Sequence, residues 1–127
     1  SLYLGAEKAI AGDRIGDIGA AVQQYAEQAG YSVVREMVGH GIGKNMHESP
    51  EVPNYGKQGK GKKLSEGMVI CIEPMINMGK KDIYLHNDGW TVSTVDKQRS
   101  AHYEFMVAVK AGKADVLTTF DYIENKF

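Results

Sequence analysis

The stretch Gly39-His40-Gly41-Ile42-Gly43-Lys44-Asn45-Met46-His47-Glu48-Ser49-Pro50 decides how the rest of the chain is organised. Its two histidines lie seven residues apart, between alternating glycines and a proline. Glycine lets the main chain approach a ligand closely. Imidazole is the commonest metal ligand and the usual proton carrier near neutral pH. We therefore expect a loop that presents side chains, with the other segments supporting it or bringing carboxylates towards it.

The segments around this loop predict helices first and strands afterwards. Leu2–Ala11 and the stripe from Ile15 to Ala29 have helical spacing, and Asp13 is the expected N-cap of the second helix. Strands are expected over Tyr31–Val38, Met68–Asn77, Trp90–Val95, Arg99–Lys110 and Ala114–Thr119, and loops over Pro50–Lys63 and Lys80–Gly89. This order is typical of an α+β fold, with helices packed on one face of a mainly antiparallel sheet.

The composition is that of one globular domain, residues 1–127, with 43% hydrophobic and 24% charged residues. The net charge of −1 implies no nucleic-acid or anionic-membrane partner. A membrane span is excluded because no apolar run is longer than that of Met68–Ile72. The single cysteine, Cys71, can form no internal disulfide, so a reducing cytoplasm fits best. The lack of an initial Met suggests a piece of a longer protein.

The run Gly56–Lys63 contains four lysines, which could form a phosphate-binding patch. The chain is nearly neutral overall, and no aromatic residues are interleaved with these lysines. A solvated, flexible loop is therefore the favoured interpretation.

Two carboxylates lie where carboxylates are costly. Glu73 interrupts an apolar strand, so pairing, hydrogen bonding or a metal must offset the cost of burying its charge. A salt bridge to Arg or Lys explains Glu73 as well as a metal does. Strand alternation puts Glu104 on a largely apolar face with His102 and Met106, which predicts a second buried acid. Two such acids, in a chain that also carries His40, indicate a site.

His40, Glu73 and Glu104 are far apart in sequence, so neighbouring strands must bring them together. One imidazole with two carboxylates suits a borderline to hard divalent ion such as Mn, Fe, Co or Zn. His47 is the better candidate for a non-ligand role, donating to a carbonyl or an anionic intermediate. A loop histidine that is hydrogen-bonded to the backbone is the alternative for His47.

Six segments stand out in order along almost the whole chain: Val33-Val34-Arg35-Glu36, Gly39-His40-Gly41-Ile42-Gly43, His47-Glu48 with Pro50-Glu51-Val52-Pro53-Asn54-Tyr55, Ile72-Glu73-Pro74-Met75, Asp88-Gly89-Trp90-Thr91-Val92 and Ser100-Ala101-His102-Tyr103-Glu104. Together they strongly resemble the type I methionine aminopeptidases. The glycine–histidine loop alone is also similar to that of prolidases and aminopeptidases P. The other segments favour the methionine-specific branch.

The resemblance implies one half of a creatinase-like pita-bread fold, in which two pseudo-symmetric halves enclose two divalent metal ions. It implies that His40, Glu73 and Glu104 are metal ligands and that His47 contacts the substrate and the intermediate. It also places Trp90 near the substrate pocket. The implied partners are the N-termini of peptides and nascent chains.

The implied reaction removes an N-terminal methionine that precedes a small residue. Paired metal ions make hydroxide available at neutral pH and polarise the scissile carbonyl. Glu73 would shuttle the proton, and His47 would stabilise the developing oxyanion.

Two departures from the family limit what the isolated chain is expected to do. No segment corresponds to the family's first half, which carries two aspartate ligands, and Phe105 stands where the family usually has histidine. We therefore expect residues 1–127 alone to be nearly inactive, to hold metal weakly if at all, and to self-associate through the exposed half-interface. The alternatives are a catalytically dead binding module of the same fold and a prolidase-type peptidase.

Overall fold

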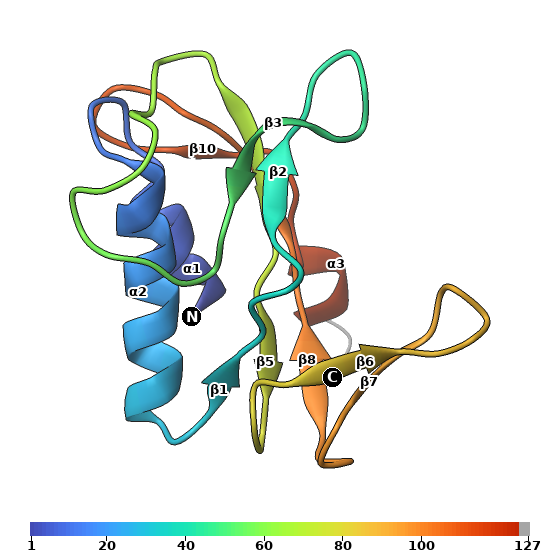
Figure 1. Ribbon diagram of the computed structural model, residues 1–127. Coiled ribbons are helices and arrows are strands. Elements are labelled where there is room, and N and C mark those ends of the chain that lie inside the picture. The colour runs from blue at the N-terminus through green and yellow to red at the C-terminus, as the bar shows by residue number, and fades with distance from the viewer. Residues whose placement is uncertain (125–127) are drawn as a thin grey trace.

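The structure is a computed structural model that describes residues 1–124, and two helices precede the strands, as the sequence predicts (Figure 1). A short third helix follows the last strand. The helices are α1 (Leu2–Ala6), α2 (Ile15–Gln28) and α3 (Asp121–Glu124). The strands are β1 (Ser32–Val33), β2 (Gly39–Gly41), β3 (Glu48–Val52), β4 (Val69–Ile72), β5 (Met75–Asn77), β6 (Ile83–Leu85), β7 (Val92–Thr94), β8 (Ser100–His102), β9 (Phe105–Ala108) and β10 (Asp115–Val116).

The strands form three sheets, and every strand pair among the described residues is antiparallel. The largest sheet has the order β10-β9-β4-β2-β3, the second has the order β1-β5-β8, and β6 pairs with β7. The β6–β7 hairpin projects from the rest of the molecule (Figure 1). The predicted α+β fold with a mainly antiparallel sheet is confirmed.

The core lies between helices α1 and α2 and one face of the largest sheet. Ile70 and Ile72 of β4 and Val107 of β9 are fully buried, and they join Ile18 of α2 in one apolar cluster. Because successive side chains of a strand point to opposite faces, Cys71 lies on the other face of β4. Its cross-strand partner on β2 is His40. The helices therefore cover one face of the sheet and leave the histidine-bearing face to the site.

Two predicted long strands are each broken into two, and the breaks lie opposite each other. β4 ends at Ile72, which pairs with Phe105, and the next strands pair Met75 with His102. Pro74 has no N–H to donate, so the ladder of β4 cannot continue through it. The chain thus passes from the largest sheet to the three-stranded sheet at Glu73. The facing segment passes between the same two sheets at Tyr103 and Glu104, where β8 ends and β9 begins. Glu73 and Glu104 therefore both lie at the junction of the sheets.

The N-terminus of α2 is capped by the lysine-rich loop rather than by Asp13, which corrects the predicted cap. The amides of Ile15 and Gly16 donate to the carbonyls of Lys62 and Lys60, at 3.0 and 2.9 Å. The N-cap residue is Arg14, whose own amide donates to Asp17 at 2.8 Å. The first helical amides need acceptors, and backbone carbonyls of a crossing loop supply them as well as a side chain does.

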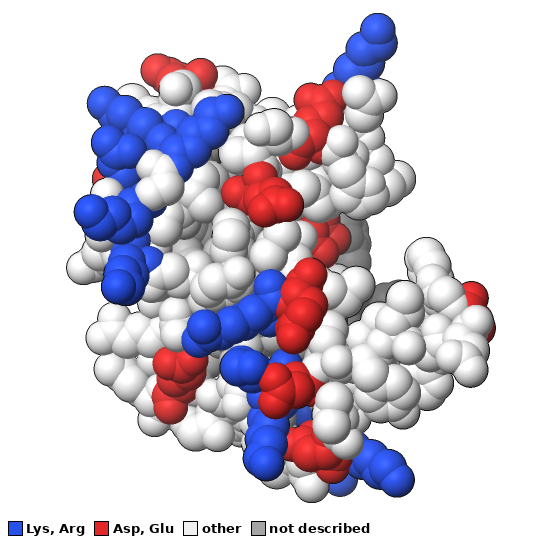
Figure 2. Space-filling view, viewed as in Figure 1, with Lys and Arg blue, Asp and Glu red and all other residues white. Residues whose placement is uncertain are grey.

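The lysine-rich loop is therefore tethered along its main chain, which differs from the flexible loop that its composition predicts. Its four lysine side chains remain exposed. Figure 2 shows basic side chains gathered over the upper-left region, where Figure 1 places this loop.

Other boundaries also differ from the predictions. The first helix ends at Ala6 instead of Ala11, and β1 covers only two residues of the strand predicted over Tyr31–Val38. Residues 50–52 belong to β3 rather than to a loop, because they pair with β2. The region Lys80–Gly89 contains β6, whose pairing with β7 was not visible from local composition. None of the helices within residues 1–124 has the length and apolar character that crossing a bilayer requires.

Candidate metal centre

His40 lies in the middle of β2, which runs between β3 and β4. A Cβ atom at Gly39 would lie 2.2 Å from the carbonyl oxygen of Cys71, and one at Gly41 would lie 2.4 Å from that of Ser49. The two glycines therefore allow the neighbouring backbones to approach on both sides of His40. The Nδ1 atom of His40 donates to the Gly41 carbonyl at 2.9 Å, since that oxygen can only accept. This bond fixes the ring and leaves Nε2 directed into the site.

Glu73 lies between two histidines at the junction of the sheets. Its Oε1 is 3.3 Å from Nε2 of His40, and its Oε2 is 3.4 Å from Nε2 of His102. Burial raises the pKa of the Glu73 carboxyl, and the negative charge of Glu104 raises it further. The two histidines act in the opposite direction and lower this pKa. The carboxylate is therefore held in a setting where additional positive charge would stabilise it.

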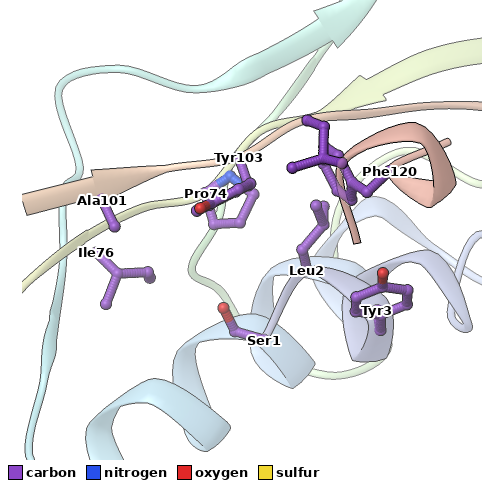
Figure 3. Close-up of a pocket in the computed structure, with 9 residues that line it drawn as sticks. Ser1, Leu2, Tyr3, Pro74, Ile76, Ala101, Tyr103 and Phe120 are labelled. Atoms are coloured by element: carbon purple, nitrogen blue, oxygen red, sulfur yellow. The ribbon is translucent and has the colours of Figure 1, made fainter. Parts of the chain in front are cut away.

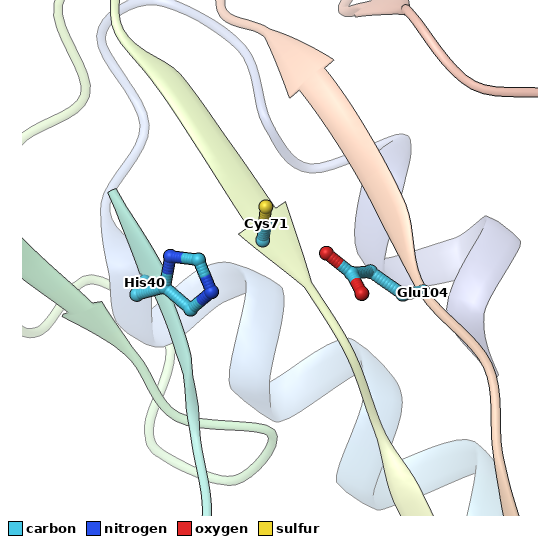
Figure 4. A group of neighbouring side chains, drawn as sticks. All are labelled: His40, Cys71 and Glu104. Atoms are coloured by element: carbon cyan, nitrogen blue, oxygen red, sulfur yellow. The ribbon is translucent and has the colours of Figure 1, made fainter. Parts of the chain in front are cut away.

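Cys71 and Glu104 complete a second group with His40 (Figure 4). One ligand atom from each of these three side chains lies within 4.8 Å of the others. The Cys71 thiol is buried, and burial raises its pKa to about 12, with smaller contributions from a hydrogen bond with Glu104 and from the charges of Glu104 and Glu73. Imidazole, carboxylate and thiol donors together fit a borderline divalent ion.

Glu104 is exposed, which corrects the prediction that it is a buried acid. The prediction assumed one continuous strand with apolar neighbours on both faces. The strand instead breaks at Tyr103 and Glu104, where the sheets separate, and the carboxylate is left open on the histidine-bearing side. The sequence predicts that neighbouring strands bring Glu104 to His40, and a ligand atom of Glu104 lies within 4.8 Å of one from His40 and one from Cys71, which was not predicted there.

His47 lies beside His40, with 4.3 Å between the ring centroids and an edge-to-face arrangement. It is exposed and follows a turn in which the Glu48 carboxylate accepts from the Asn45 amide at 2.7 Å. The turn directs the second histidine of the loop back onto the first. An exposed imidazole at this position can reach a ligand that is bound near His40.

Trp90 is 87% exposed at the end of the β6–β7 hairpin. It lines a hollow of about 400 Å³ together with Met37, Met75, Val92 and His102. Because His102 also contacts Glu73, this hollow opens next to the group of histidines and acids.

A second cavity, of about 380 Å³, has a different position (Figure 3). It is lined by residues of α1, by Ile76, Ala101 and Tyr103, and by Phe120. Ile76 and Ala101 are neighbours in the β5–β8 ladder of Met75 and His102, so they point to the opposite face. The sheet therefore separates this cavity from the candidate metal centre.

The sequence-based predictions assigned no role in the site to three residues that lie there: His102, Cys71 and Asn54. His102 could have been found from its place on the Glu104 face of the predicted strand. Cys71 occupies the same face of its strand as Glu73, which alternation predicts. Asn54 is fully buried and donates from Nδ2 to the Glu73 carbonyl at 3.3 Å, a contact between distant segments that no local pattern indicates.

Comparison with known proteins identifies the family. Residues 1–111 match the family model described as metallopeptidase family M24. The chain belongs to metallopeptidase family M24. Methionine aminopeptidase of Clostridium perfringens is 52% identical over 118 residues, which cover 93% of this chain and 47% of that relative. The chain thus spans about half the length of the curated relatives it matches.

Solved structures share the fold of this chain. The crystal structure of methionine aminopeptidase from Rickettsia prowazekii superposes with a TM-score of 0.91 at 45% identity, covering 93% of this chain and 48% of that one. Prolidase from Pyrococcus furiosus has a TM-score of 0.67 at 24% identity and shares the fold. These likenesses confirm the prediction of a fold that matches part of the pita-bread architecture.

Proposed function

We propose that this chain carries part of the metal centre of a methionine aminopeptidase, which removes the N-terminal methionine from peptides and nascent proteins. The observation that carries the proposal is the convergence of His40, Glu73 and Glu104 from three segments that are distant in sequence. The identity to relatives named methionine aminopeptidase supports the choice of substrate. We place the reaction in the cytoplasm, where nascent chains and reduced thiols occur together.

In this proposal His40, Glu73 and Glu104 hold two divalent ions, which could be Co, Mn, Fe or Zn. Bound ions of this kind supply a nucleophile at neutral pH and polarise the scissile carbonyl. The Nδ1 bond of His40 to Gly41 keeps its Nε2 available as a ligand atom. Asn54 holds the main chain at Glu73 and so keeps the carboxylate in place.

Glu73 also serves as the proton carrier. As a carboxylate ligand beside the nucleophile that the ions would supply, it can accept and return a proton there. His47 donates a hydrogen bond to the oxygen on which negative charge develops, from its place beside His40. The hollow lined by Trp90, Met75 and Met37 offers an apolar surface for the methionine side chain next to these groups.

The proposal is tested in a chimera, because the family resemblance assigns two further aspartate ligands to a segment that residues 1–127 do not contain. The 118-residue segment of the Clostridium perfringens enzyme that matches this chain would be replaced by the corresponding residues of this chain. We expect the chimera to release methionine from a Met-Ala peptide with added Mn or Co. His40→Ala and Glu73→Gln should each abolish release. Glu66→Gln changes an exposed acid just before β4 and should leave release unchanged.

The same assay separates the alternatives. Cleavage of X-Pro peptides in place of Met-Ala would favour a prolidase-type peptidase. A folded chimera that binds peptides without cleaving them would favour a binding module. Residues 1–127 alone should release almost no methionine, and measurable release by the isolated chain would contradict that expectation.

A further inference from the structure

The segment that follows β10 packs against the chain at the point where the two sheets separate. Phe120 comes just before α3 and lies outside residues 1–111, which match the family model. Its ring centroid lies 5.0 Å from that of Phe105, with 32° between the ring planes, and 5.5 Å from that of Tyr103, edge to face. Phe105 and Tyr103 are the two neighbours of Glu104 in the chain. One aromatic side chain therefore contacts the residues on both sides of Glu104.

These ring contacts lie on the face opposite to the Glu104 carboxylate. Tyr103 and Phe120 line the cavity that the sheet separates from the candidate metal centre (Figure 3). A carboxylate oxygen of Glu104 lies within 4.8 Å of ligand atoms of His40 and Cys71, on the other side (Figure 4). Alternation explains this division, because the neighbours of a residue in extended chain point to the opposite face. The rings thus hold the main chain from behind while the carboxylate faces the site.

Hydrogen bonds attach the same segment to β9. The Met106 amide donates to Thr118 Oγ1 at 3.1 Å, and the Leu117 amide donates to the Met106 carbonyl at 2.8 Å. Glu104 belongs neither to β8, which ends before it, nor to β9, which begins after it. The packing of Phe120 and these two bonds therefore give this stretch the support that a strand ladder gives elsewhere.

Groups that orient a metal ligand tune the affinity of the site for its ion. We propose that Phe120 is a positioning residue, whose ring fixes the main chain around Glu104 and thereby sets where that carboxylate lies for a metal ion. The inference rests on the proposed function, in which Glu104 is a ligand. It adds a residue that acts only through its neighbours, from the face opposite to the ligands.

Phe120 also covers part of the apolar core, against which it packs. A covering role alone predicts that loss of the ring lowers the melting temperature and leaves metal binding by the folded protein unchanged. A positioning role predicts that the folded protein also binds metal more weakly. Metal binding by the folded protein therefore separates the two roles.

The test uses the chimera of the proposed function, carried on to the end of this chain so that it contains Phe120. Metal is removed, and binding of Co²⁺ is followed by titration calorimetry and by the visible absorption of the bound ion, which reports its coordination geometry. We expect Phe120→Leu to weaken Co²⁺ binding at least about tenfold and to change the absorption spectrum. Phe120→Tyr keeps a ring at this position and should bind Co²⁺ like the parent chimera.

Thr118→Val tests the same support without altering a ring. It nearly keeps the shape of the side chain and removes the oxygen that accepts from the Met106 amide, so it should also weaken Co²⁺ binding. Tyr122→Leu is the matched control, because Tyr122 is 81% exposed, and it should bind Co²⁺ like the parent chimera. Val22→Ala removes fully buried methyl groups of α2, so it should lower the melting temperature and leave Co²⁺ binding unchanged.

The outcomes separate this inference from the proposed function. Unchanged Co²⁺ binding by folded Phe120→Leu would overturn the positioning role and leave the metal centre standing, and Thr118→Val decides in the same way if Phe120→Leu does not fold. Equal weakening by Val22→Ala would also overturn the role, since general destabilisation would then explain the loss. Glu104→Gln should weaken Co²⁺ binding strongly. If it does not, or if the parent chimera binds no Co²⁺, the proposed metal centre fails and this inference fails with it.

Discussion

At the scale of single residues, steric contact explains why both neighbours of His40 are glycines. Gly39 and Gly41 let β2 lie between two neighbouring backbones, and the bond from His40 to the Gly41 carbonyl then orients the ring. The histidine is therefore presented by a strand rather than by a flexible loop. This explains how the His40 ring can be held accurately without a large buried core around it.

Gly39→Ala should unfold the site because the added Cβ would meet the backbone oxygen of Cys71 at 2.2 Å. Backbone cannot yield as a side-chain end can, so we expect a loss of at least about 3 kcal/mol in the free energy of unfolding. Gly59→Ala is the control, since the added Cβ would meet nothing within 4 Å. The only expected cost is the strain of placing alanine at the positive φ of 69° that Gly59 adopts. That cost should be about 1–2 kcal/mol. Equal losses in urea denaturation of the two variants would contradict the steric explanation.

Asp96 makes stability depend on pH at a position remote from the metal centre. Its carboxylate accepts from the Lys80 amide at 2.6 Å and from the Gln98 amide at 3.1 Å, and these bonds lower its pKa. A carboxyl whose pKa is depressed on folding adds stability above its unfolded pKa and loses it as pH falls through the folded pKa.

Asp96→Asn should therefore lower the melting temperature at neutral pH, and the difference from wild type should shrink towards about pH 2. Scanning calorimetry at several pH values measures this difference. Glu66→Gln, at an exposed position, should match the wild type at neutral pH. A difference for Asp96→Asn that stays constant down to low pH would show that the carboxylate charge is not responsible.

At the scale of elements, β4 connects the core to the site. Its residues alternate between the helix-covered face, with Ile70 and Ile72, and the face that carries Cys71, next to His40. The same strand thus anchors the fold and ends directly before Glu73. Substitutions on the buried face of β4 should therefore also shift the position of the Glu73 carboxylate.

Ile70→Ala should destabilise the chain by about 2–5 kcal/mol, because it deletes buried methyl and methylene groups and leaves a cavity. Val116→Ala in β10 is the matched control, since Val116 is 43% exposed and should change stability by less than about 0.5 kcal/mol. Denaturant unfolding followed by tyrosine and tryptophan fluorescence compares the two. A similar effect of both substitutions would contradict the assignment of Ile70 to the core.

At the scale of the whole molecule, apolar surface and an open strand edge lie on the side of the second cavity. β8 is an edge strand of its sheet, and its three residues are exposed. Tyr103 and Met78 are 60% and 55% exposed close to the same ladder. Unpaired strand edges beside apolar surface promote pairing between chains.

We expect the isolated 127-residue chain to self-associate, with a sedimentation coefficient that rises with protein concentration. Ala101→Lys places a charge on the β8 edge and should reduce this association. Ala111→Lys, in the exposed turn after β9, makes the same chemical change elsewhere and should leave association unchanged. A single monomeric species at high concentration in the wild type would contradict the prediction.

The sequence by itself determined the order of the elements, the antiparallel class of the sheet and the types of residue that converge. Helical spacing and the apolar character of Met68–Ile72 reflect local preferences, which need no knowledge of distant segments. The glycine-flanked His40 and the acid within an apolar strand, Glu73, were visible for the same reason. A residue type that is costly in its local setting indicates a partner even before that partner is known.

The tertiary structure alone decided where the strands break and which side chains meet there. Pro74 ends β4, but only pairing with the facing strand shows that both strands change sheets together, which exposes Glu104 and brings His102 to Glu73. The capping of α2 by carbonyls of the lysine-rich loop, in place of Asp13, is of the same kind. These features depend on contacts between residues far apart in sequence, and local propensity does not encode such contacts.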